Sequence, residues 1–384
     1  MTLMQTYNRA PITLVKGKGS YVWDDQENCY LDYTAGIATC NLGHVPDYVK
    51  QKVSEQMEKL WHCSNLYHIP AQSQLADILV EHSCAHQAFF CNSGAEANEA
   101  AIKLARKYGK EVKNGAYYIV SFNQSFHGRT LAALSATGQT KVHKGFEPLV
   151  EGFIYLEYND MEALQQIHPK KTAAVLLELV QGEGGVVPAD PVWLRKLADF
   201  CQQNNILLMV DEVQTGIGRT GSLFCYQQFN IEPDVITLAK GLGSGFAIGA
   251  LLAKEHAAKY FTPGSHASTF GGNPIAATAG LATVEFLIEH RIAEKVQVLA
   301  EYLNSGLLEL QKHYPIIRQV RGMGLLCGLL VGERAADVVV KARDKKLLIL
   351  TAGTDVVRIL PPLTTTKAEI DQCVSILDQV FQSL

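Results

Sequence analysis

Short apolar runs alternate with amphipathic helical segments through the middle of the chain, and this alternation constrains the fold more than any other feature. The runs have the length of buried strands and read QAFFCN, AYYIVSF, AAVLLEL, NILLMVDE and DVITLAK. Helical patterns such as GAEANEAAIKLARKYG and DPVWLRKLADFCQQN lie between them. Apolar strands that alternate with helices predict βαβ units. We therefore expect an α/β fold with a mainly parallel sheet that is covered by helices on both faces.

The two ends of the chain have a different pattern from the middle. Residues 17–33 predict a hairpin of two short strands around a polar turn, and a helical pattern starts near residue 46. After about residue 275 a long helical stretch leads to further strands and a closing helix that starts with the capping-box pair Thr366 and Glu369. In a chain of 384 residues, we predict that residues 1–45 and 275–384 form a smaller α+β domain and residues 46–274 a large one.

Composition and charge exclude several classes of partner. The formal net charge is −4 and the basic residues are scattered, so no positive field attracts nucleic acid. The first residues lack a signal-peptide pattern, and no apolar stretch approaches the length of a membrane span. We therefore expect a cytoplasmic protein without a membrane partner. The nine cysteines include no CxxC pair, which indicates reduced, mostly buried thiols, and no metal site is expected.

Polar residues follow the apolar runs at the positions where an α/β sheet binds its ligands, outside the carboxyl ends of the strands. Three groups stand out, namely residues 178–183, residues 211–214 and Lys240. Lys240 follows DVITLA, where an ammonium is poorly solvated and can become a nucleophile for Schiff-base chemistry. A phosphate-binding lysine is the alternative, but a P-loop lysine follows its glycines and Lys240 precedes GLGSG. Asp211 ends a buried run and needs a positive partner, which a protonated pyridine nitrogen of pyridoxal phosphate would supply.

A candidate phosphate site lies where the run QAFFCN passes into a helix. The segment Cys91-Asn92-Ser93-Gly94-Ala95-Glu96 places free N–H groups and the positive end of the helix dipole together. Ser93 and Glu96 also have the spacing of a capping box, and both interpretations can hold at once.

A glycine pattern and two arginines have more specific contexts. Gly216, Gly218 and Gly221 match the GxGxxG pattern of dinucleotide-binding turns, but the segment after them is short for a crossover helix. Arg129 follows SFHG, and Arg358 lies in the apolar run VVRILPP. An arginine within an apolar strand indicates an anionic partner, and a guanidinium binds a carboxylate with two hydrogen bonds.

These residues lie in motifs that resemble those of the class III aminotransferases, the ω-amine subgroup of the pyridoxal-phosphate-dependent family. The matching segments run nearly from end to end, and the chain differs from the usual phosphate motif in having Ala267 where a glycine is common. The motifs are GIATCNLGH at 36–44, FFCNSGAEANEAAIKLARK at 89–107, SFHGRT at 125–130, LELVQGEGGV at 177–186, DEVQTGIGRTG at 211–221, LAKGLGSG at 238–245, STFGGNP at 268–274 and VVRILPPLT at 356–364. The resemblance implies the fold type I architecture of pyridoxal-phosphate enzymes.

The resemblance also implies roles for individual residues. Lys240 would bond to pyridoxal 5'-phosphate and, once released, move the 1,3-proton, while Asp211 would pair with the pyridine nitrogen. Gln214 would contact the ring hydroxyl, and Phe126 would stack on the ring face. The residues that would hold the phosphate are Ser93, Gly94, Ala95 and, from the other subunit of a homodimer, Thr269. The residues that would bind substrate are Arg129, Arg358 and Ser268, with Glu183 paired to Arg358 while the donor is bound.

The implied reaction is transamination of N2-acetyl-L-ornithine with 2-oxoglutarate, which gives N-acetyl-L-glutamate 5-semialdehyde and L-glutamate in arginine biosynthesis. Members specific for ornithine usually carry a tyrosine near the segment that reads Gly36-Ile37-Ala38 here, and its absence favours an acylated donor. Ornithine, succinylornithine, succinyldiaminopimelate and 4-aminobutyrate are the alternative donors. A nicotinamide dehydrogenase that uses the GxGxxG segment and a binding protein without activity are the alternatives from other classes.

Overall fold

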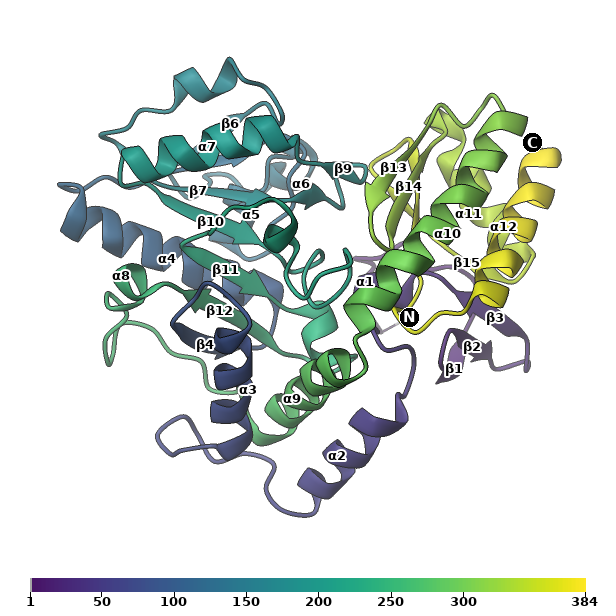
Figure 1. The fold of residues 1–384 in the computed structure, drawn as a ribbon, viewed down its shortest axis with the longest axis horizontal. Helices are drawn as coiled ribbons and strands as arrows, with labels where there is room; N and C mark the ends of the chain where they lie inside the picture. Colours follow the sequence, from purple (N-terminus) through teal and green to yellow (C-terminus); the bar gives the residue numbers. More distant parts are fainter. Residues whose placement is uncertain (1) are drawn as a thin grey trace.

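The computed structural model describes residues 2–384, and its largest element is a seven-stranded sheet with the order β4-β12-β11-β10-β7-β5-β6 (Figure 1). Strand β12 is antiparallel to β4 and to β11, whereas the other neighbouring pairs are parallel. The runs predicted as strands all lie in this sheet, so the predicted α/β class is confirmed. The strands are β4 (Gln87–Cys91), β5 (Tyr118–Phe122), β6 (Phe153–Leu156), β7 (Thr172–Glu178), β10 (Leu207–Asp211), β11 (Val235–Leu238) and β12 (Gly249–Ala253).

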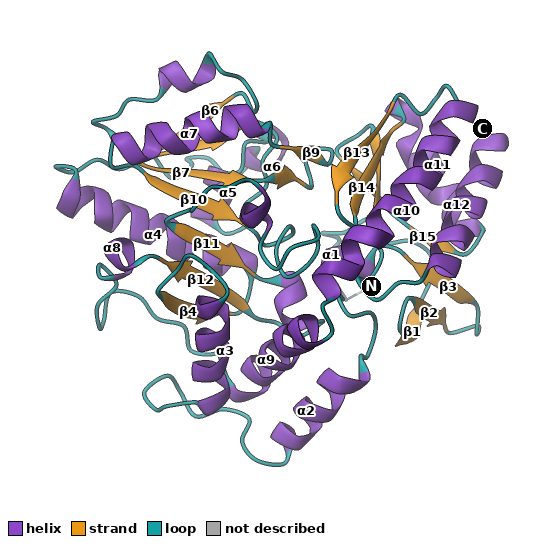
Figure 2. Ribbon diagram, in the orientation of Figure 1, coloured by secondary structure: helices purple, strands orange, loops and turns teal. Residues whose placement is uncertain are grey.

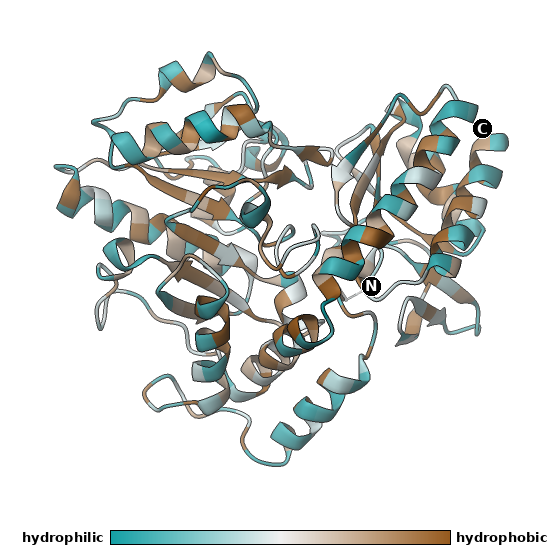
Figure 3. Ribbon diagram, in the orientation of Figure 1, coloured by the Kyte–Doolittle hydropathy of each residue, from teal (hydrophilic) through white to brown (hydrophobic). Residues whose placement is uncertain are grey.

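The large sheet is apolar on both faces because helices cover both. In β7 every residue is buried, and alternate side chains enter different cores. Val175 and Leu177 belong to one hydrophobic cluster, whereas Ala174 and Leu176 belong to another. Figure 3 shows these central strands as a continuous hydrophobic layer. The helices in this part of the chain are α2 (Asp47–Met57), α3 (Pro70–Glu81), α4 (Gly94–Val112), α5 (Leu131–Ala136), α6 (Thr140–His143), α7 (Pro191–Gln203) and α8 (Glu255–Ala258).

The starts of the long helices follow from their capping residues. Ser93 precedes α4, and its Oγ accepts a hydrogen bond from the Glu96 N–H at 3.2 Å. Asp190 precedes α7, and its Oδ1 accepts from the N–H groups of Val192 and Trp193. These bonds satisfy N–H groups that have no acceptor within the helix. The interpretation of Ser93 as a cap is therefore confirmed.

Two smaller four-stranded sheets lie beside the large one, and one of them pairs the two chain ends (Figure 2). One sheet has the order β1-β2-β3-β15 and joins Leu31 of β3 to Leu347 of β15 in parallel register. The hairpin expected within 17–33 is β2 and β3, and β1 adds a further strand at its edge. The other sheet has the order β13-β14-β17-β16. The strands are β1 (Leu14–Lys18), β2 (Tyr21–Asp24), β3 (Cys29–Asp32), β13 (Gln319–Met323), β14 (Leu326–Leu330), β15 (Leu347–Leu348), β16 (Leu350–Ala352) and β17 (Val356–Ile359), while a separate pair is β8 (Val180–Gln181) and β9 (Val187–Pro188).

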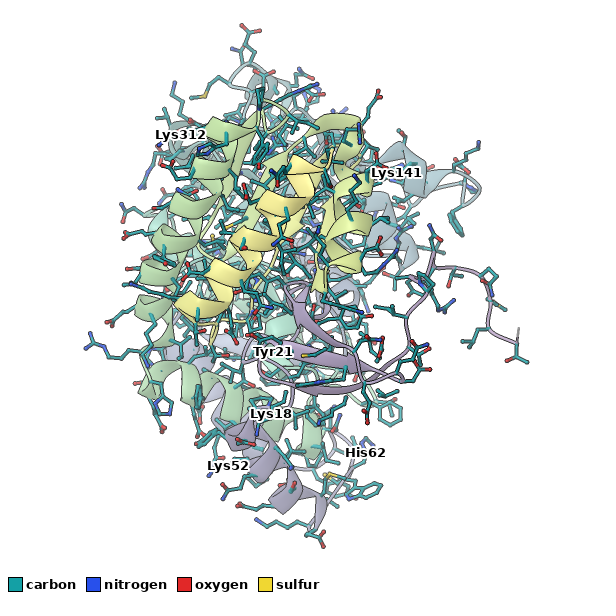
Figure 4. The ribbon with its side chains drawn as sticks, turned by 90° about the vertical axis from the view of Figure 1, so that its right-hand side faces the viewer. Lys18, Tyr21, Lys52, His62, Lys141 and Lys312 are labelled. Atoms are coloured by element: carbon teal, nitrogen blue, oxygen red, sulfur yellow. The ribbon has the colours of Figure 1, made fainter. Side chains whose placement is uncertain are left out.

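Long helices cover the outer side of these small sheets, as Figure 4 shows from that side. Helix α12 begins with the predicted capping box of Thr366 and Glu369. Its buried side includes Ile370, Cys373, Leu377 and Phe381. The Tyr21 hydroxyl donates to Gln372 Oε1 at 3.0 Å and so ties the N-terminal strands to this C-terminal helix. The helices of this part are α10 (Ile292–His313), α11 (Ala335–Asp344) and α12 (Lys367–Gln382), whereas α9 (Pro274–Glu289) packs against α2 and α3.

The predicted domain boundaries at residues 45 and 274 fall next to the starts of α2 and α9, and the division itself stays a prediction. All nine cysteines are free, and five of them are buried. No disulfide joins them, and their reduced state stays a prediction. None of the helices within residues 2–384 is both long enough and apolar enough to span a membrane.

Candidate active site

A cavity of about 490 Å³ lies at the carboxyl ends of the central strands. Segments that are far apart in the sequence line it: the start of α4, the loops after β5 and β7, the end of β10, and the turn after β11. The ends of parallel strands meet at one edge of a sheet, which is why these segments converge. The predicted site residues that this cavity brings together are Ser93, Gly94, Ala95, Phe126, Arg129, Glu183, Asp211, Gln214 and Lys240.

Lys240 is the first residue of a short 3-10 helix (Lys240–Gly243) that follows β11. Its backbone has a φ of 42°, in the left-handed region that a residue with a Cβ adopts only at a cost of about 1–3 kcal/mol. Burial lowers the pKa of the Lys240 ammonium and the charge of Arg358 lowers it further, while the carboxylates of Glu183, Asp211 and Glu178 act in the opposite direction. An amine whose pKa is lowered is unprotonated more often, and only that form is a nucleophile or base.

Asp211 ends β10 with only 3% of its surface exposed. Its Oδ2 accepts a hydrogen bond from Asn98 Nδ2 at 2.7 Å and lies 2.8 Å from His127 Nδ1, while its Oδ1 accepts from the Val213 N–H at 3.0 Å. Thr237 fixes Asn98 in turn, since its hydroxyl donates to Asn98 Oδ1 at 2.7 Å. Within the described chain no lysine or arginine forms an ion pair with Asp211. The carboxylate is therefore oriented by neighbours that carry no permanent charge.

The start of α4 forms the wall of the cavity where an anion can bind. A Cβ on Gly94 would lie 2.7 Å from Val213 Cγ1, so only glycine allows the helix to approach the loop after β10 this closely. The first N–H groups of a helix have no acceptor within the helix, and the helix dipole adds positive potential there. Ser93, Gly94 and Ala95 can therefore hold a phosphate.

The two predicted arginines differ in their exposure and in their ion-pair partners. Arg358, on β17, is 2% exposed, and its Nη1 donates to Glu183 Oε1 at 2.6 Å and to Gln214 Oε1 at 3.1 Å. Burial alone would raise the pKa of Glu183, but Arg358 above all, with Lys240 and Gln214, brings that pKa below its usual value. Arg129 is exposed, and its guanidinium carbon lies 5.6 Å from the centre of the Phe126 ring. No carboxylate of residues 2–384 pairs with Arg129. Arg358 is thus closed, in the sense that Glu183 occupies its guanidinium, whereas Arg129 is open to bind a carboxylate.

Three predicted residues do not line the cavity: Arg358, which contacts two residues that do, and Ser268 and Thr269. Ser268 and Thr269 line a separate hollow beside the start of α4, together with Phe270 and Asn92. Ser268 Oγ accepts a hydrogen bond from Asn92 Nδ2 at 3.2 Å, and Thr269 is exposed. Within one chain, Ser268 and Thr269 do not line the cavity that contains Lys240.

The sequence interpretation gave no individual role to three residues that the structure places at the site, although Glu178 belongs to the candidate group 178–183. Asn98 and His127 both contact Asp211, and Glu178 lines the cavity beside it. Asn98 carried a usable signal, because it is a polar residue on the otherwise apolar, buried side of α4. His127 and Glu178 stood within recognised motifs but had been given no role.

The glycine-rich segment 216–221 is not a dinucleotide-binding turn. The segment after it contains a short 3-10 helix (Cys225–Gln228) instead of a crossover helix. Asp234, the acidic residue nearest the offset expected for a dinucleotide site, instead accepts a hydrogen bond at its Oδ2 from the N–H of Leu208 in β10 at 2.8 Å. The structure therefore supports the argument against a dehydrogenase.

Fold and site together define an enzyme of pyridoxal-phosphate chemistry, and comparisons with known proteins agree. The family model "Aminotransferase class-III" matches residues 3–381. Acetylornithine aminotransferase of Oceanobacillus iheyensis is 57% identical over 100% of this chain and 96% of its own. Among solved structures, N-acetylornithine aminotransferase from Stenotrophomonas maltophilia is 35% identical with a TM-score of 0.86, covering 98% of this chain and 97% of its own. Ornithine aminotransferase from Toxoplasma gondii is 31% identical with a TM-score of 0.95, covering 100% and 93%.

The chain belongs to the class III aminotransferases. It is therefore an enzyme that acts on small molecules and uses pyridoxal 5'-phosphate. The cavity fits this cofactor: the start of α4 suits the phosphate, and the buried Asp211 suits a protonated ring nitrogen. Lys240 and Phe126 also line the cavity, where they would offer an amine and an aromatic face to the ring.

Proposed function

We propose that this enzyme transfers the amino group of N2-acetyl-L-ornithine to 2-oxoglutarate and forms N-acetyl-L-glutamate 5-semialdehyde and L-glutamate in arginine biosynthesis. The main support is the pair of arginines, Arg129 open and Arg358 closed by Glu183. A donor with one carboxylate needs one free arginine, whereas 2-oxoglutarate carries a second carboxylate that can replace Glu183 on Arg358. The curated relatives at 47–57% identity are acetylornithine aminotransferases, which agrees with this proposal.

The chain's own residues would divide the chemistry as follows. The bound cofactor supplies an electron sink that stabilises negative charge at the substrate carbon. Asp211, oriented by Asn98 and His127, would hold the proton on the ring nitrogen. Lys240 Nζ would take up and return the proton of the substrate carbon, for which its lowered pKa suits it. Arg129 would orient the α-carboxylate of either substrate.

The remaining cofactor contacts form part of the same proposal. Ser93, Gly94 and Ala95 would hold the phosphate, and Phe126 would stack on the ring. Gln214 would turn its amide nitrogen toward the ring hydroxyl, since its Oε1 already accepts from Arg358.

The segment before Thr39 favours an acylated donor. Ala35, Gly36, Ile37 and Ala38 all have positive φ and form a left-handed turn, and Thr39 after it lines the cavity. Gly36 and Ile37 present no charged or hydroxyl group that could receive a free α-ammonium. An unpaired buried ammonium costs several kcal/mol, so a site of this kind should reject free ornithine.

We also propose that the active unit is a homodimer in which Ser268 and Thr269 complete the partner's site. The segment after α2 and the Thr269 segment touch, because Asn65 Nδ2 donates to the carbonyls of Ser268 and Gly271 at 2.9 Å. Together they present an exposed apolar surface that a second copy would cover. Its exposed side chains are Met57, Leu60, Trp61, Leu66, Tyr67 and Phe270. The cytoplasmic location stays part of this proposal.

Initial rates with 2-oxoglutarate and a panel of donors test the substrate. We expect acetylornithine to have the highest kcat/KM, followed by succinylornithine, with ornithine and 4-aminobutyrate far lower. Ornithine is the informative competitor, since the structural relative from Toxoplasma gondii is an ornithine aminotransferase. If ornithine equals or exceeds acetylornithine, the proposed donor is wrong although the family membership stands. The visible spectrum of the purified protein is the first control, because a colourless protein would contradict cofactor binding.

A further inference from the structure

Glu178 and Asp211 lie side by side at the edge of the cavity. They are register partners on the adjacent parallel strands β7 and β10. Register partners on neighbouring strands point to the same face of a sheet. Both side chains are buried, at 6% and 3% exposure, and both line the cavity. Asp211 has a place in the proposed chemistry, but Glu178 has none there.

The Glu178 carboxylate bridges two loops of the site. Its Oε1 accepts a hydrogen bond from the Phe126 N–H at 2.9 Å, in the loop after β5. Its Oε2 accepts from the Gly182 N–H at 3.2 Å, in the loop after β7. Phe126 is the aromatic residue of the cavity, and Gly182 immediately precedes Glu183, the partner of Arg358. One side chain therefore fixes the backbone at the two places where these functional residues begin.

The surroundings of both loops leave this arrangement little freedom. A Cβ on Gly182 would lie 2.1 Å from Gln214 Oε1, so the loop after β7 is pressed against the residue that also contacts Arg358. On the other side, the N–H of His127, next to Phe126, donates to Thr137 Oγ1 at 2.9 Å. The Glu178 backbone is itself held, because its carbonyl oxygen accepts from the Tyr158 hydroxyl at 2.8 Å. The Glu178 carboxylate thus links two loops, and each loop has a further contact that restricts it.

Electrostatics add a reason to expect function at this position. Burial raises the pKa of Glu178 to about 7 and the charge of Asp211 acts in the same direction, whereas His127 and the two backbone N–H groups lower it. A buried glutamate beside a second carboxylate is costly for the fold alone, and such costs concentrate at functional sites.

We propose that Glu178 is a positioning residue that holds the Phe126 loop and the Glu183 loop in a fixed relation to each other. The ring-stacking face and the pair of Glu183 with Arg358 then keep their alignment while different substrates occupy the site. This inference rests on the transamination proposed above, but its first test does not depend on that proposal.

The chain contains a matched control. Glu212 is also a buried glutamate at the end of a central strand, and it also accepts two backbone N–H bonds, from Cys225 and Tyr226, both at 2.7 Å. Burial raises the pKa of Glu212 as well, to about 8. Unlike Glu178, it does not line the cavity. A purely structural role predicts the same behaviour for Glu178→Gln and Glu212→Gln.

Amide hydrogen exchange of the full-length enzyme with its cofactor bound is the first test. Glutamine keeps one acceptor but turns an NH₂ group toward the other loop, so Glu178→Gln should speed exchange at residue 126 or 182 by roughly tenfold, as loss of one hydrogen bond to a charged group predicts. Glu178→Asp, one methylene shorter, should give the same result and replaces the glutamine variant if that variant does not fold. Glu212→Gln should speed exchange only near residues 225 and 226. Unchanged exchange at both 126 and 182 would overturn the proposal.

Single-turnover rates of the two half-reactions are the second test. Release of the Glu183 loop weakens the closure of Arg358, so Glu178→Gln should slow the half-reaction of the donor by roughly tenfold while KM for 2-oxoglutarate does not rise. Glu212→Gln should change the melting temperature without this asymmetry. Equal effects on both half-reactions, or the same asymmetry in Glu212→Gln, would overturn the positioning role. A wild-type enzyme without transaminase activity would refute the proposed function instead, and the exchange result would still decide whether Glu178 joins the loops.

Discussion

His127 Nδ1 lies 2.8 Å from Asp211 Oδ2, at a position that solvent does not reach. Asn98 Nδ2 donates to the same oxygen, so the surroundings of Asp211 require a hydrogen-bond acceptor at this position. Asp211→Asn would keep the size but turn an amide N–H toward one of these donors and remove the charge proposed for the ring nitrogen. We expect the proton-transfer step to slow by several orders of magnitude, because electrostatic preorganisation is usually the largest catalytic effect. Single-turnover absorbance measures that step, and a loss of less than about tenfold, or 1.4 kcal/mol, would contradict the role of Asp211.

Replacement of Lys240 tests the reactive amine. Lys240→Ala should abolish transamination, yet the protein should still bind pyridoxal phosphate, because the start of α4, Phe126 and Asp211 all remain. Turnover assays and equilibrium dialysis of the cofactor measure the two effects separately. Retained turnover, or labelling of another lysine by borohydride in the wild type, would refute the assignment.

Subunit mixing tests the shared site. In a hybrid dimer of a Lys240→Ala chain and a Thr269→Ala chain, one of the two sites would have both residues intact. Part of the activity should therefore return when the two inactive proteins exchange subunits. Native mass spectrometry confirms the exchange, and a hybrid population without activity would show that Thr269 does not serve the partner.

Arg129→Lys tests the open carboxylate site. Lysine keeps the positive charge but cannot form the two parallel hydrogen bonds of a guanidinium. We expect kcat/KM for acetylornithine to fall by roughly tenfold or more, and that for 4-aminobutyrate, which lacks an α-carboxylate, to fall less. Equal losses for the two donors would place the α-carboxylate elsewhere.

The His44 and Asp32 pair predicts a pH dependence of stability. His44 Nε2 lies 2.8 Å from Asp32 Oδ2, and the hydrogen bonds to Asp32 and then Cys40 raise the pKa of His44 from 6.5 to about 10 against the effect of burial. The folded state therefore holds this proton more tightly than the unfolded state does. Its stabilising effect is complete below about pH 6.5 and is lost as the pH rises toward 10. Urea unfolding should give a free-energy difference between wild type and His44→Asn that shrinks over this range, and a difference that grows with pH would contradict the pairing.

The large sheet and the positions of Lys240 and Asp211 at its edge could be predicted from the sequence because local patterns determine them. Each central strand is a run of apolar residues of the right length, and a polar residue at its end must lie at the ligand edge of the sheet. That rule places Lys240 and Asp211 at the ligand edge, and their roles stay predictions that the resemblance implies. The caps at Ser93 and Thr366 follow equally, since they depend on residues three positions apart.

The roles of other residues depend on contacts between distant segments, which no local pattern contains. Asn98 lies 113 residues from Asp211 in the sequence, and Glu178 lies 52 residues from Phe126. Val49, Val53, Met57 and Leu60 have the spacing of one helical face, yet only Val49 and Val53 are buried, and Met57 and Leu60 are exposed in the single chain. Their apolar character makes sense only if something outside the chain covers them.

The parallel pairing of β3 with β15 has a consequence for how the enzyme is made. Tyr30 and Lys346, which meet at this pairing, are 316 residues apart. At roughly 5–20 residues per second, a ribosome needs on the order of a minute or less to supply the second strand, and β3 has no partner on that side until then. Translation thus supplies all strands of the large sheet before β15 and before Arg358 on β17. We expect a nascent chain that stalls between β12 and β17 to contain Lys240 and Asp211 but to lack Arg358, the residue proposed to bind the second carboxylate.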